Sequence, residues 1–353
     1  MPQTYRASVI GAGMAGHLAL DALKVSLRFT PVAVSDVNAA ALAKIATEYP
    51  DVRTFPSPEA MFAASPADVV CIATYAPSHL LLTLAALAQK PRGLSVEKPL
   101  ADTTAAARQI EQAVKAAGVP VAVPHGLLVA PHSVDLIRRV RAGEIGQLRS
   151  VEFQNSGWDL INAGIHWFNF FVALTDREPL QWVLCACDTS TRTYRDGMQV
   201  ETMGVTYAVT RSGVRLILNS GDHVPVATSD SGFLCHILGT EGHIEFYGWK
   251  NEYRLVNAAH PKGTIIKVEN GGITNHRRHF ESLAAQMDAA KPDYAVLESS
   301  LMALEICEAA YVSHRCHRQI MLPLTGAETP DCGVWDPGRP YAGTGGGRDG
   351  RKL

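Results

Sequence analysis

The first third of the chain alternates short apolar runs with longer segments of helical periodicity. Continuous runs of Val, Ile and Ala predict buried strands, and the segments between them, one of them opened by the capping residue Asn38, predict helices. Such alternation is typical of a parallel sheet covered on both faces. Strands are expected at residues 7–10, 31–35, 69–73, 93–96 and 119–123, and helices at 15–27, 39–48, 78–88 and 104–117.

After about residue 124 strand-like segments dominate. Ser212-Gly213 and Glu241-Gly242 predict tight hairpin turns between successive strands. This part is therefore expected to form an open, mostly antiparallel sheet with helices on one face. The expected strands are residues 149–154, 182–187, 200–210, 214–221, 233–239, 243–247 and 253–256, and the expected helices are 133–141, 162–174, 276–290 and 296–314.

The two patterns divide the chain into an α/β domain at residues 1–124 and an α+β domain at residues 125–324. A length of 353 residues agrees with two cores rather than one. Residues 325–353 are rich in Gly and Pro and cannot build a core of their own. We expect them to form an arm that lies on its own body or on a neighbouring subunit.

Composition excludes several classes of protein. Charged residues make up 19% of the chain, the formal net charge is -2, and no Lys/Arg run is long enough to follow phosphates, so neither a nucleic-acid nor a membrane partner is expected. Without a leader-like start or an apolar span, a cytoplasmic location is expected. The seven cysteines lack CxxC spacing, which favours reduced thiols over disulfides or a zinc site, and Cys185 and Cys187 are interpreted as core residues. No metal is expected.

The first strand leads directly into a Gly-x-Gly-x-x-Gly motif and a helix. Gly11 allows the tight turn, Gly13 lets the backbone approach a pyrophosphate, and Gly16 lets helix and strand pack closely. The diphosphate would lie on the first N–H groups of the helix, around Met14 and Ala15. The motif predicts a dinucleotide-binding Rossmann domain, with a glycine-rich turn that binds no ligand as the alternative.

Asp36 ends the second expected strand, roughly 20 residues after the glycines, where an acidic residue binds the adenosine ribose. Its carboxylate accepts hydrogen bonds from the ribose hydroxyls and repels a 2′-phosphate. Neither Ser35 nor Val37 is a base that would neutralise that phosphate. The cofactor is therefore expected to be NAD rather than NADP, although Asp36 also suits the cap of the next helix.

Glu97, Lys98 and Pro99 follow another parallel strand, and ligands of such sheets bind at the carboxyl ends of strands. Beside a cationic nicotinamide, Lys98 should have a lowered pKa and exchange a proton with a substrate hydroxyl near neutral pH. Taken alone, a Glu-Lys-Pro turn is most often a solvated corner.

The glycine motif, Asp36 and the Glu97–Pro99 turn together resemble the glucose–fructose oxidoreductase / inositol dehydrogenase (Gfo/Idh/MocA) family. The similarity extends over roughly residues 5–323. Further segments that are similar to the family are Thr74 with Ala76-Pro77-Ser78-His79, Gly143-Glu144-Ile145-Gly146, Asn162-Ala163-Gly164-Ile165-His166, Phe280 and the helix at 296–314.

The resemblance implies an NAD-dependent oxidoreductase with its pocket between the two domains. The substrate hydroxyl would lie between Lys98 and His166, one of which takes its proton while hydride passes to C4 of the nicotinamide. Asn162, four residues before His166, would point the same way on a helix and hold the substrate or orient His166. The remaining residues assigned to the site are Thr74, Pro77, His79 and Glu97 on the cofactor side and His125, Trp158 and Asp159 on the substrate side.

Several of these residues have other interpretations. Asn162 stands where the family usually has Asp, and an amide cannot take up a proton. Leu128 lies in a loop that commonly carries Arg in the family, so that His125 would contact cofactor or substrate instead. Trp158 also suits a surface loop. The segment 276–279, which holds two histidines and two arginines, is interpreted as a solvated helix start rather than a metal site.

The expected function is oxidation of a secondary ring hydroxyl of a sugar, glycoside or cyclitol by NAD. Two alternatives remain: an enzyme that retains and recycles its NAD, as a sugar–sugar oxidoreductase or in a glycoside-cleaving elimination, and a non-catalytic sugar or dinucleotide sensor. In the family the open face of the sheet usually forms a subunit interface. The resemblance therefore implies a homo-oligomer, a dimer, tetramer or larger, joined through the large sheet and the C-terminal arm.

Overall fold

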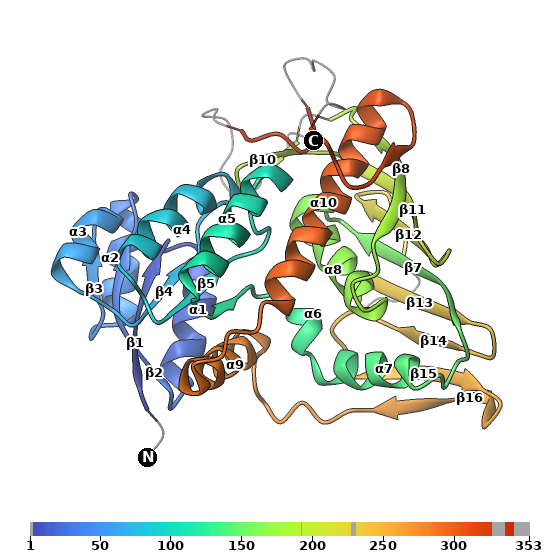
Figure 1. Ribbon diagram of the computed structural model, residues 1–353, viewed down its shortest axis with the longest axis horizontal. Coiled ribbons are helices and arrows are strands. Elements are labelled where there is room, and N and C mark those ends of the chain that lie inside the picture. The colour runs from blue at the N-terminus through green and yellow to red at the C-terminus, as the bar shows by residue number, and fades with distance from the viewer. Residues whose placement is uncertain (1–2, 192, 227–230, 327–335, 342–353) are drawn as a thin grey trace. The chain divides into compact units, whose positions relative to one another are not determined.

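The computed structural model describes residues 3–191, 193–226, 231–326 and 336–341, and the chain forms two compact units (Figure 1). The first unit comprises the described residues of Met1–Ala101, Ala105–Pro124 and Gly272–Leu301. The second comprises those of Asp102–Thr104, His125–Gly271 and Met302–Leu353. Among the described residues no helix is both long and apolar enough to cross a membrane.

The first unit is built on a six-stranded sheet in the order β3-β2-β1-β4-β5-β6, in which neighbouring strands are parallel. The chain runs outward from β1 in one direction and then from β4 in the other, so the strand order reverses between them, which is where such sheets bind ligands. Its elements are β1 (Tyr5–Ile10), α1 (Met14–Val25), β2 (Phe29–Ser35), α2 (Ala39–Glu48), β3 (Arg53–Phe55), α3 (Pro58–Ala64), β4 (Val69–Ile72), α4 (His79–Ala88), β5 (Gly93–Val96), α5 (Thr104–Ala117), β6 (Val121–Ala122) and α9 (Asn275–Ala289).

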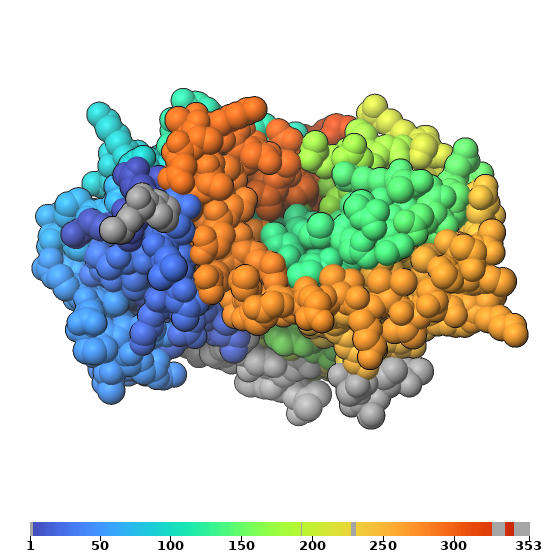
Figure 2. Space-filling model, turned by 90° about the horizontal axis from the view of Figure 1, so that it is seen from below, coloured from blue at the N-terminus to red at the C-terminus, as the bar shows by residue number. Residues whose placement is uncertain are grey.

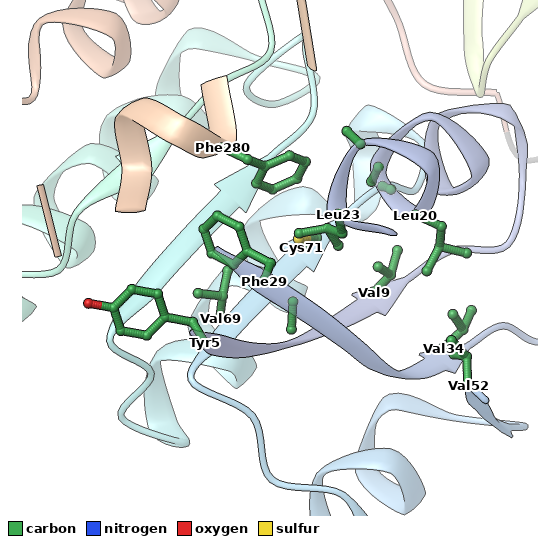
Figure 3. Packing of buried hydrophobic residues seen from close by; sticks show 14 of the residues in the cluster. Tyr5, Val9, Leu20, Leu23, Phe29, Val34, Val52, Val69, Cys71 and Phe280 are labelled. Atoms are coloured by element: carbon green, nitrogen blue, oxygen red, sulfur yellow. The ribbon is translucent and has the colours of Figure 1, made fainter. Parts of the chain in front are cut away.

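Helix α9 packs against α1 and β6 of this unit, although it begins more than 150 residues after β6 (Figure 1). On the surface seen in Figure 2 the orange part of this unit lies beside the blue N-terminal part. Phe280 is buried, and its ring lies 5.7 Å from that of Phe29 in an edge-on arrangement (Figure 3). Leu283 and Met287 join the same apolar cluster. The compact units thus differ from the expected domain boundaries, since a segment within residues 125–324 completes the Rossmann core.

The second unit contains a nine-stranded sheet in the order β16-β15-β14-β13-β7-β12-β11-β8-β17. Its neighbouring strands are antiparallel except for β12 and β7, which confirms the α+β fold class with a mostly antiparallel sheet. The elements are α6 (Gly126–Val129), α7 (Pro131–Arg141), β7 (Leu148–Ser156), α8 (Ile165–Leu174), β8 (Leu180–Asp188), β11 (Met203–Thr210), β12 (Arg215–Gly221), β13 (Phe233–Gly239), β14 (His243–Phe246), β15 (Glu252–Asn257), β16 (His260–Lys267), β17 (Ile320–Met321) and the part of α10 (Ala295–Cys316) from Met302 onward, with a separate pair of strands, β9 (Thr193–Arg195) and β10 (Met198–Val200).

Helix α8 covers one face of this sheet through aromatic side chains. The ring of Trp167 lies 5.2 Å from that of Phe153 in β7, and the ring of Phe170 lies 5.6 Å from that of Phe246 in β14. All four side chains are buried, as expected for a helix that is apolar on nearly every side. This packing fixes the position of α8 on the sheet.

The segment expected to be one helix at residues 162–174 instead consists of a π-helical turn, Leu160–Gly164, followed by α8. The backbone N–H of Gly164 donates to the carbonyl of Asp159, five residues back, at 3.0 Å, and the side chain of Asp159 caps the turn by accepting from the backbone N–H of Asn162 at 2.8 Å. The prediction that Asn162 and His166 lie on the same α-helix is therefore wrong.

Part of the C-terminal arm lies on the second unit. The backbone N–H of Gln199 donates to the carbonyl of Arg339 at 2.8 Å, and that of Gly338 donates to the carbonyl of Gln199 at 2.9 Å. Asp336 forms an ion pair with Arg315 at 2.9 Å. Residues 336–341 therefore extend the β9–β10 pair, while residues 327–335 and 342–353 of the expected arm lie outside the described residues.

Candidate active site

Two of the three motif glycines are required by the packing of the first unit. Gly11 has φ of +106°, and a Cβ on it would lie 2.4 Å from the carbonyl oxygen of Ala73. A Cβ on Gly16 would lie 2.1 Å from the carbonyl oxygen of Gly11. In both cases the Cβ would clash with a backbone carbonyl oxygen, and moving that oxygen would distort the main chain at a cost in free energy. Only glycine therefore fits at either position.

Gly13 differs, because a Cβ there would meet none of the described heavy atoms within 4 Å. It is the N-cap of α1, with ordinary extended dihedral angles, and Met14 beside it is 55% exposed. The open space lies where the first N–H groups of the helix and the positive end of its dipole are concentrated. A dinucleotide pyrophosphate fits this cradle.

Asp36 ties the glycine loop to the end of β2. Its Oδ2 accepts a hydrogen bond from the backbone N–H of Ala12 at 2.7 Å, and its Oδ1 accepts one from that of Asn38 at 2.7 Å. Asn38, rather than Asp36, caps α2 by accepting from Ala40 and Ala41. Because each carboxylate oxygen accepts more than one hydrogen bond, Asp36 retains the capacity to bind ribose hydroxyls.

His79 lies between the loops that follow β4 and β5 and contacts both of them through its ring nitrogens. It is fully buried; its Nδ1 lies 2.9 Å from the carbonyl oxygen of Pro99, and its Nε2 lies 2.9 Å from that of Thr74. Thr74 is also 2.7 Å from Ser78 through their hydroxyl groups. Burial lowers the pKa of His79. His79 and Thr74 thus hold the loop that contains Pro77 and set the position of the turn that carries Lys98.

Glu97 is 7% exposed and pairs with His276 from the start of α9, with 3.3 Å between Oε1 and Nε2. Burial by itself would raise the pKa of Glu97, but the hydrogen bond and charge of His276, together with Lys98, hold it below its usual value. Residues 276–279 do form a helix start, as expected, but the side chain of His276 is only 21% exposed and contacts Glu97 rather than being fully solvated.

In the second unit, Asp159 organises the turn that carries Asn162. Its Oδ1 accepts from the side-chain amide of Asn162 at 2.9 Å, and its Oδ2 forms an ion pair with Arg195 at 2.9 Å. The guanidinium of Arg195 lies 4.3 Å from the centre of the Trp158 ring. Asp159 is 1% exposed, which suits a group that positions its neighbours.

A second buried acid, Glu201, lies against the same turn. It accepts hydrogen bonds from the backbone N–H of Leu160 at 2.7 Å and from the hydroxyl of Tyr311 at 2.7 Å. Burial, followed by repulsion from Asp159, raises the pKa of Glu201 to about 7. This buried acid gives the turn a titratable group near neutral pH.

His166 follows the turn at the start of α8 and lies in an aromatic cluster. Its ring is 5.5 Å from that of His125, at 83°, and 5.9 Å from that of Trp249, at 85°. His125 is 1% exposed and precedes α6, whereas Trp249 is 45% exposed. The two expected histidines are therefore brought together within one unit, while Trp249 gave no signal in the sequence.

The residues expected to bind the cofactor, together with Lys98, belong to the first unit. The residues expected on the substrate side belong to the second: His125, Trp158, Asp159, Asn162 and His166. Among the residues that the structure describes, no group of three or more His, Cys, Asp or Glu side chains is placed to hold a metal ion.

Residues 5–125 match the family model described as the Gfo/Idh/MocA oxidoreductase family, NAD-binding Rossmann fold. Inositol 2-dehydrogenase from Acidothermus cellulolyticus is 33% identical over 146 residues, which is 41% of this chain and 42% of that relative. The chain thus matches less than half the length of this curated relative.

Solved structures resemble the fold over nearly the whole chain. The oxidoreductase domain protein from Kribbella flavida has a TM-score of 0.79 at 16% identity and covers 92% of this chain and 100% of its own. The WlbA dehydrogenase from Chromobacterium violaceum, solved with NADH and UDP-GlcNAcA, has a TM-score of 0.75 at 20% identity and covers 92% and 99%.

Residues 5–125 thus match the NAD-binding Rossmann domain of the Gfo/Idh/MocA oxidoreductase family, and the rest of the chain shares the fold of the solved structures. The match confirms both the resemblance drawn from the motifs and the expectation of NAD as the cofactor.

Proposed function

We propose that the protein is an NAD-dependent dehydrogenase that oxidises a secondary ring hydroxyl of a sugar, glycoside or cyclitol. The observation that carries the proposal is the continuous set of loops at the carboxyl ends of β1, β4 and β5. Gly11 packs on Ala73, and His79 joins Thr74 to the Lys98–Pro99 turn, so that Lys98 lies at the ligand edge of the sheet.

Lys98 and His166 are the proposed proton-handling residues. The nicotinamide supplies the acceptor for the carbinol hydride, and the hydroxyl proton must leave to a base as the carbonyl forms. A lysine amine and an imidazole both serve as such bases near neutral pH. The carboxylate of Glu97, which pairs with His276 at 3.3 Å, belongs to the same turn as Lys98 and helps to fix that turn.

Asn162 is proposed to bind or orient the substrate rather than to carry protons. Its side-chain N–H group donates to Asp159 at 2.9 Å, and the same group lies 3.4 Å from the carbonyl of Arg195. These contacts fix which end of the amide is the donor. Asp159 and Arg195 then act as positioning residues, and His125 supports the ring of His166.

NAD is proposed over NADP because Asp36 places a carboxylate where a 2′-phosphate would have to lie. The relatives agree with the substrate class: inositol 2-dehydrogenase is named for a cyclitol, and the WlbA structure contains a nucleotide-linked sugar.

We also propose a homo-oligomer joined through the open face of the large sheet. Leu184 is 44% exposed and Val205 is 40% exposed on neighbouring strands of that face, near the Trp182 and Tyr207 rings. An apolar surface of this kind is typical of a protein interface. Light scattering should give a dimer or larger for the wild type and a smaller species for the double variant Leu184→Glu/Val205→Glu.

The enzymatic proposal is tested by NADH formation with a panel of sugars, glycosides and inositols. Lys98→Ala and His166→Ala should each lower kcat/KM by at least about 100-fold, whereas Lys44→Ala and His260→Ala, on exposed surfaces, should not change it. Full activity of Lys98→Ala would contradict the mechanism. Retained NADH absorbance in the purified protein without net turnover would favour the alternative in which NAD is recycled between two substrates.

A further inference from the structure

Trp249 presents an exposed aromatic surface next to the proposed catalytic histidine. Its ring lies 5.9 Å from that of His166, nearly perpendicular to it, and the residue is 45% exposed. The indole of tryptophan is a large, flat and rigid apolar surface that suits the binding of a ring-shaped ligand. Its place beside a histidine of the proposed site makes this surface available to a bound substrate.

The turn that carries Trp249 is held firmly between β14 and β15. Gly248 has φ of +53°, and a Cβ on it would lie 3.1 Å from that of Phe233, so the turn packs closely on β13. The backbone N–H of Lys250 donates to the carbonyl of Tyr247 at 3.2 Å, and the carbonyl of Asn251 accepts from Val268 at 2.8 Å. The indole is thus mounted on the sheet that also supports α8.

The face of an indole ring is electron-rich and attracts the weakly positive C–H groups of a ligand. A pyranose or cyclitol ring with equatorial hydroxyls directs its axial C–H groups to its two faces, which makes each face apolar and flat. An acyclic polyol has no such face, because its C–H groups point in many directions and its chain must lose rotational freedom to imitate one.

We propose that Trp249 is a specificity-determining residue, the platform on which the ring of the substrate stacks, and that it makes the site select cyclic over acyclic polyols. This inference rests on the proposed function, since it assigns the substrate ring a place beside His166. The same contact would hold the ring while His166 engages one of its hydroxyl groups.

The test compares Trp249→Ala, Trp249→Phe and wild type, with Ile265→Ala as a control that removes an equally exposed apolar side chain of the same unit. Trp249→Ala should raise KM for the best cyclic substrate of the panel about tenfold with little change in kcat. KM for sorbitol, an acyclic polyol, should stay within about twofold. Trp249→Phe should recover most of the loss, and Ile265→Ala should match wild type. Equal losses for cyclic and acyclic substrates, or a fall in kcat alone, would show a structural role and overturn the inference.

A binding measurement separates this inference from the proposed function. Saturation-transfer NMR on the NAD-loaded protein with methyl β-D-glucopyranoside and myo-inositol should show transfer to the axial ring protons, lost in Trp249→Ala and kept in His166→Ala. If that pattern appears without any NADH formation, the platform stands and the dehydrogenase proposal fails. If NADH forms and the NMR signals are the same in wild type and Trp249→Ala, the platform is refuted and the dehydrogenase stands.

Discussion

The glycine loop offers a sharp prediction, because its glycines serve different purposes. Gly11→Ala places a methyl group 2.4 Å from the carbonyl oxygen of Ala73 and forces alanine to φ of +106°. Backbone strain and overpacking each cost about 1–3 kcal/mol, so we expect a loss of about 3 kcal/mol or more in the free energy of unfolding. Gly13→Ala meets none of the described atoms within 4 Å and keeps allowed dihedral angles, so its cost should be about 1 kcal/mol or less.

The order of the two variants should reverse for cofactor binding by the folded protein. The methyl group of Gly13→Ala occupies the space through which the pyrophosphate approaches α1, and NAD affinity should fall at least about tenfold, which is about 1.4 kcal/mol.

Thermal unfolding without cofactor and titration calorimetry with NAD measure the two effects separately. Gly13→Ala should melt within about 3 °C of wild type, and Gly11→Ala should melt about 6 °C or more below it. The reasoning is refuted if Gly13→Ala binds NAD as tightly as wild type, or if it unfolds as readily as Gly11→Ala.

Three further predictions concern buried or bonded acids. Asp36→Asn removes the charge that repels a 2′-phosphate. The ratio of NADP affinity to NAD affinity should therefore rise about tenfold in a fluorescence titration. An unchanged ratio would count against the role of Asp36 in cofactor choice. Burial raises the pKa of Glu201 to about 7 in the folded protein, so the protonated acid stabilises the fold fully below pH 4.5 and this stabilisation is lost as pH rises through 7. The free energy of unfolding in urea should therefore be higher at pH 5 than at pH 8. Glu201→Gln should remove up to about 3 kcal/mol of this difference. His276→Ala leaves Glu97 buried without its imidazole partner and should destabilise the protein by about 1–3 kcal/mol at pH 7. Since His276 lowers the pKa of Glu97, the loss should shrink as pH falls below 4.5, and equal losses at pH 7 and at low pH in urea unfolding would contradict the pairing.

The sequence predicted the fold where local pattern and long-range packing agree. The strand at residues 7–10, the glycine motif and Asp36 form one local unit that can be recognised from the sequence, and in the structure the carboxylate of Asp36 binds the backbone N–H of Ala12 in the glycine loop. The hairpin at Ser212-Gly213 was predictable for the same reason, since the turn type follows from two neighbouring residues.

The sequence could not reveal contacts that join distant segments. The sequence around Phe280 predicts an amphipathic helix but not the sheet on which it packs. Only the contact of Phe280 with Phe29 shows that α9 belongs to the Rossmann core. His276 lies in a charged segment that is typical of an exposed helix start. Its contact with Glu97 could not be predicted, because the two residues lie 179 positions apart in the chain. The π-helical turn is closed by a backbone hydrogen bond from Gly164 to Asp159, and the pattern of apolar residues gives no sign of it.

The most direct test of the account follows the hydride itself. The best substrate of the panel is labelled with deuterium at the carbinol carbon and incubated with NAD and the wild-type protein, and the reduced cofactor is analysed by mass spectrometry and NMR. The account predicts one deuterium at C4 of the nicotinamide, and at least about 100-fold slower transfer with Lys98→Ala. Reduced cofactor without deuterium, or no reduction with any sugar, glycoside or inositol, would contradict it.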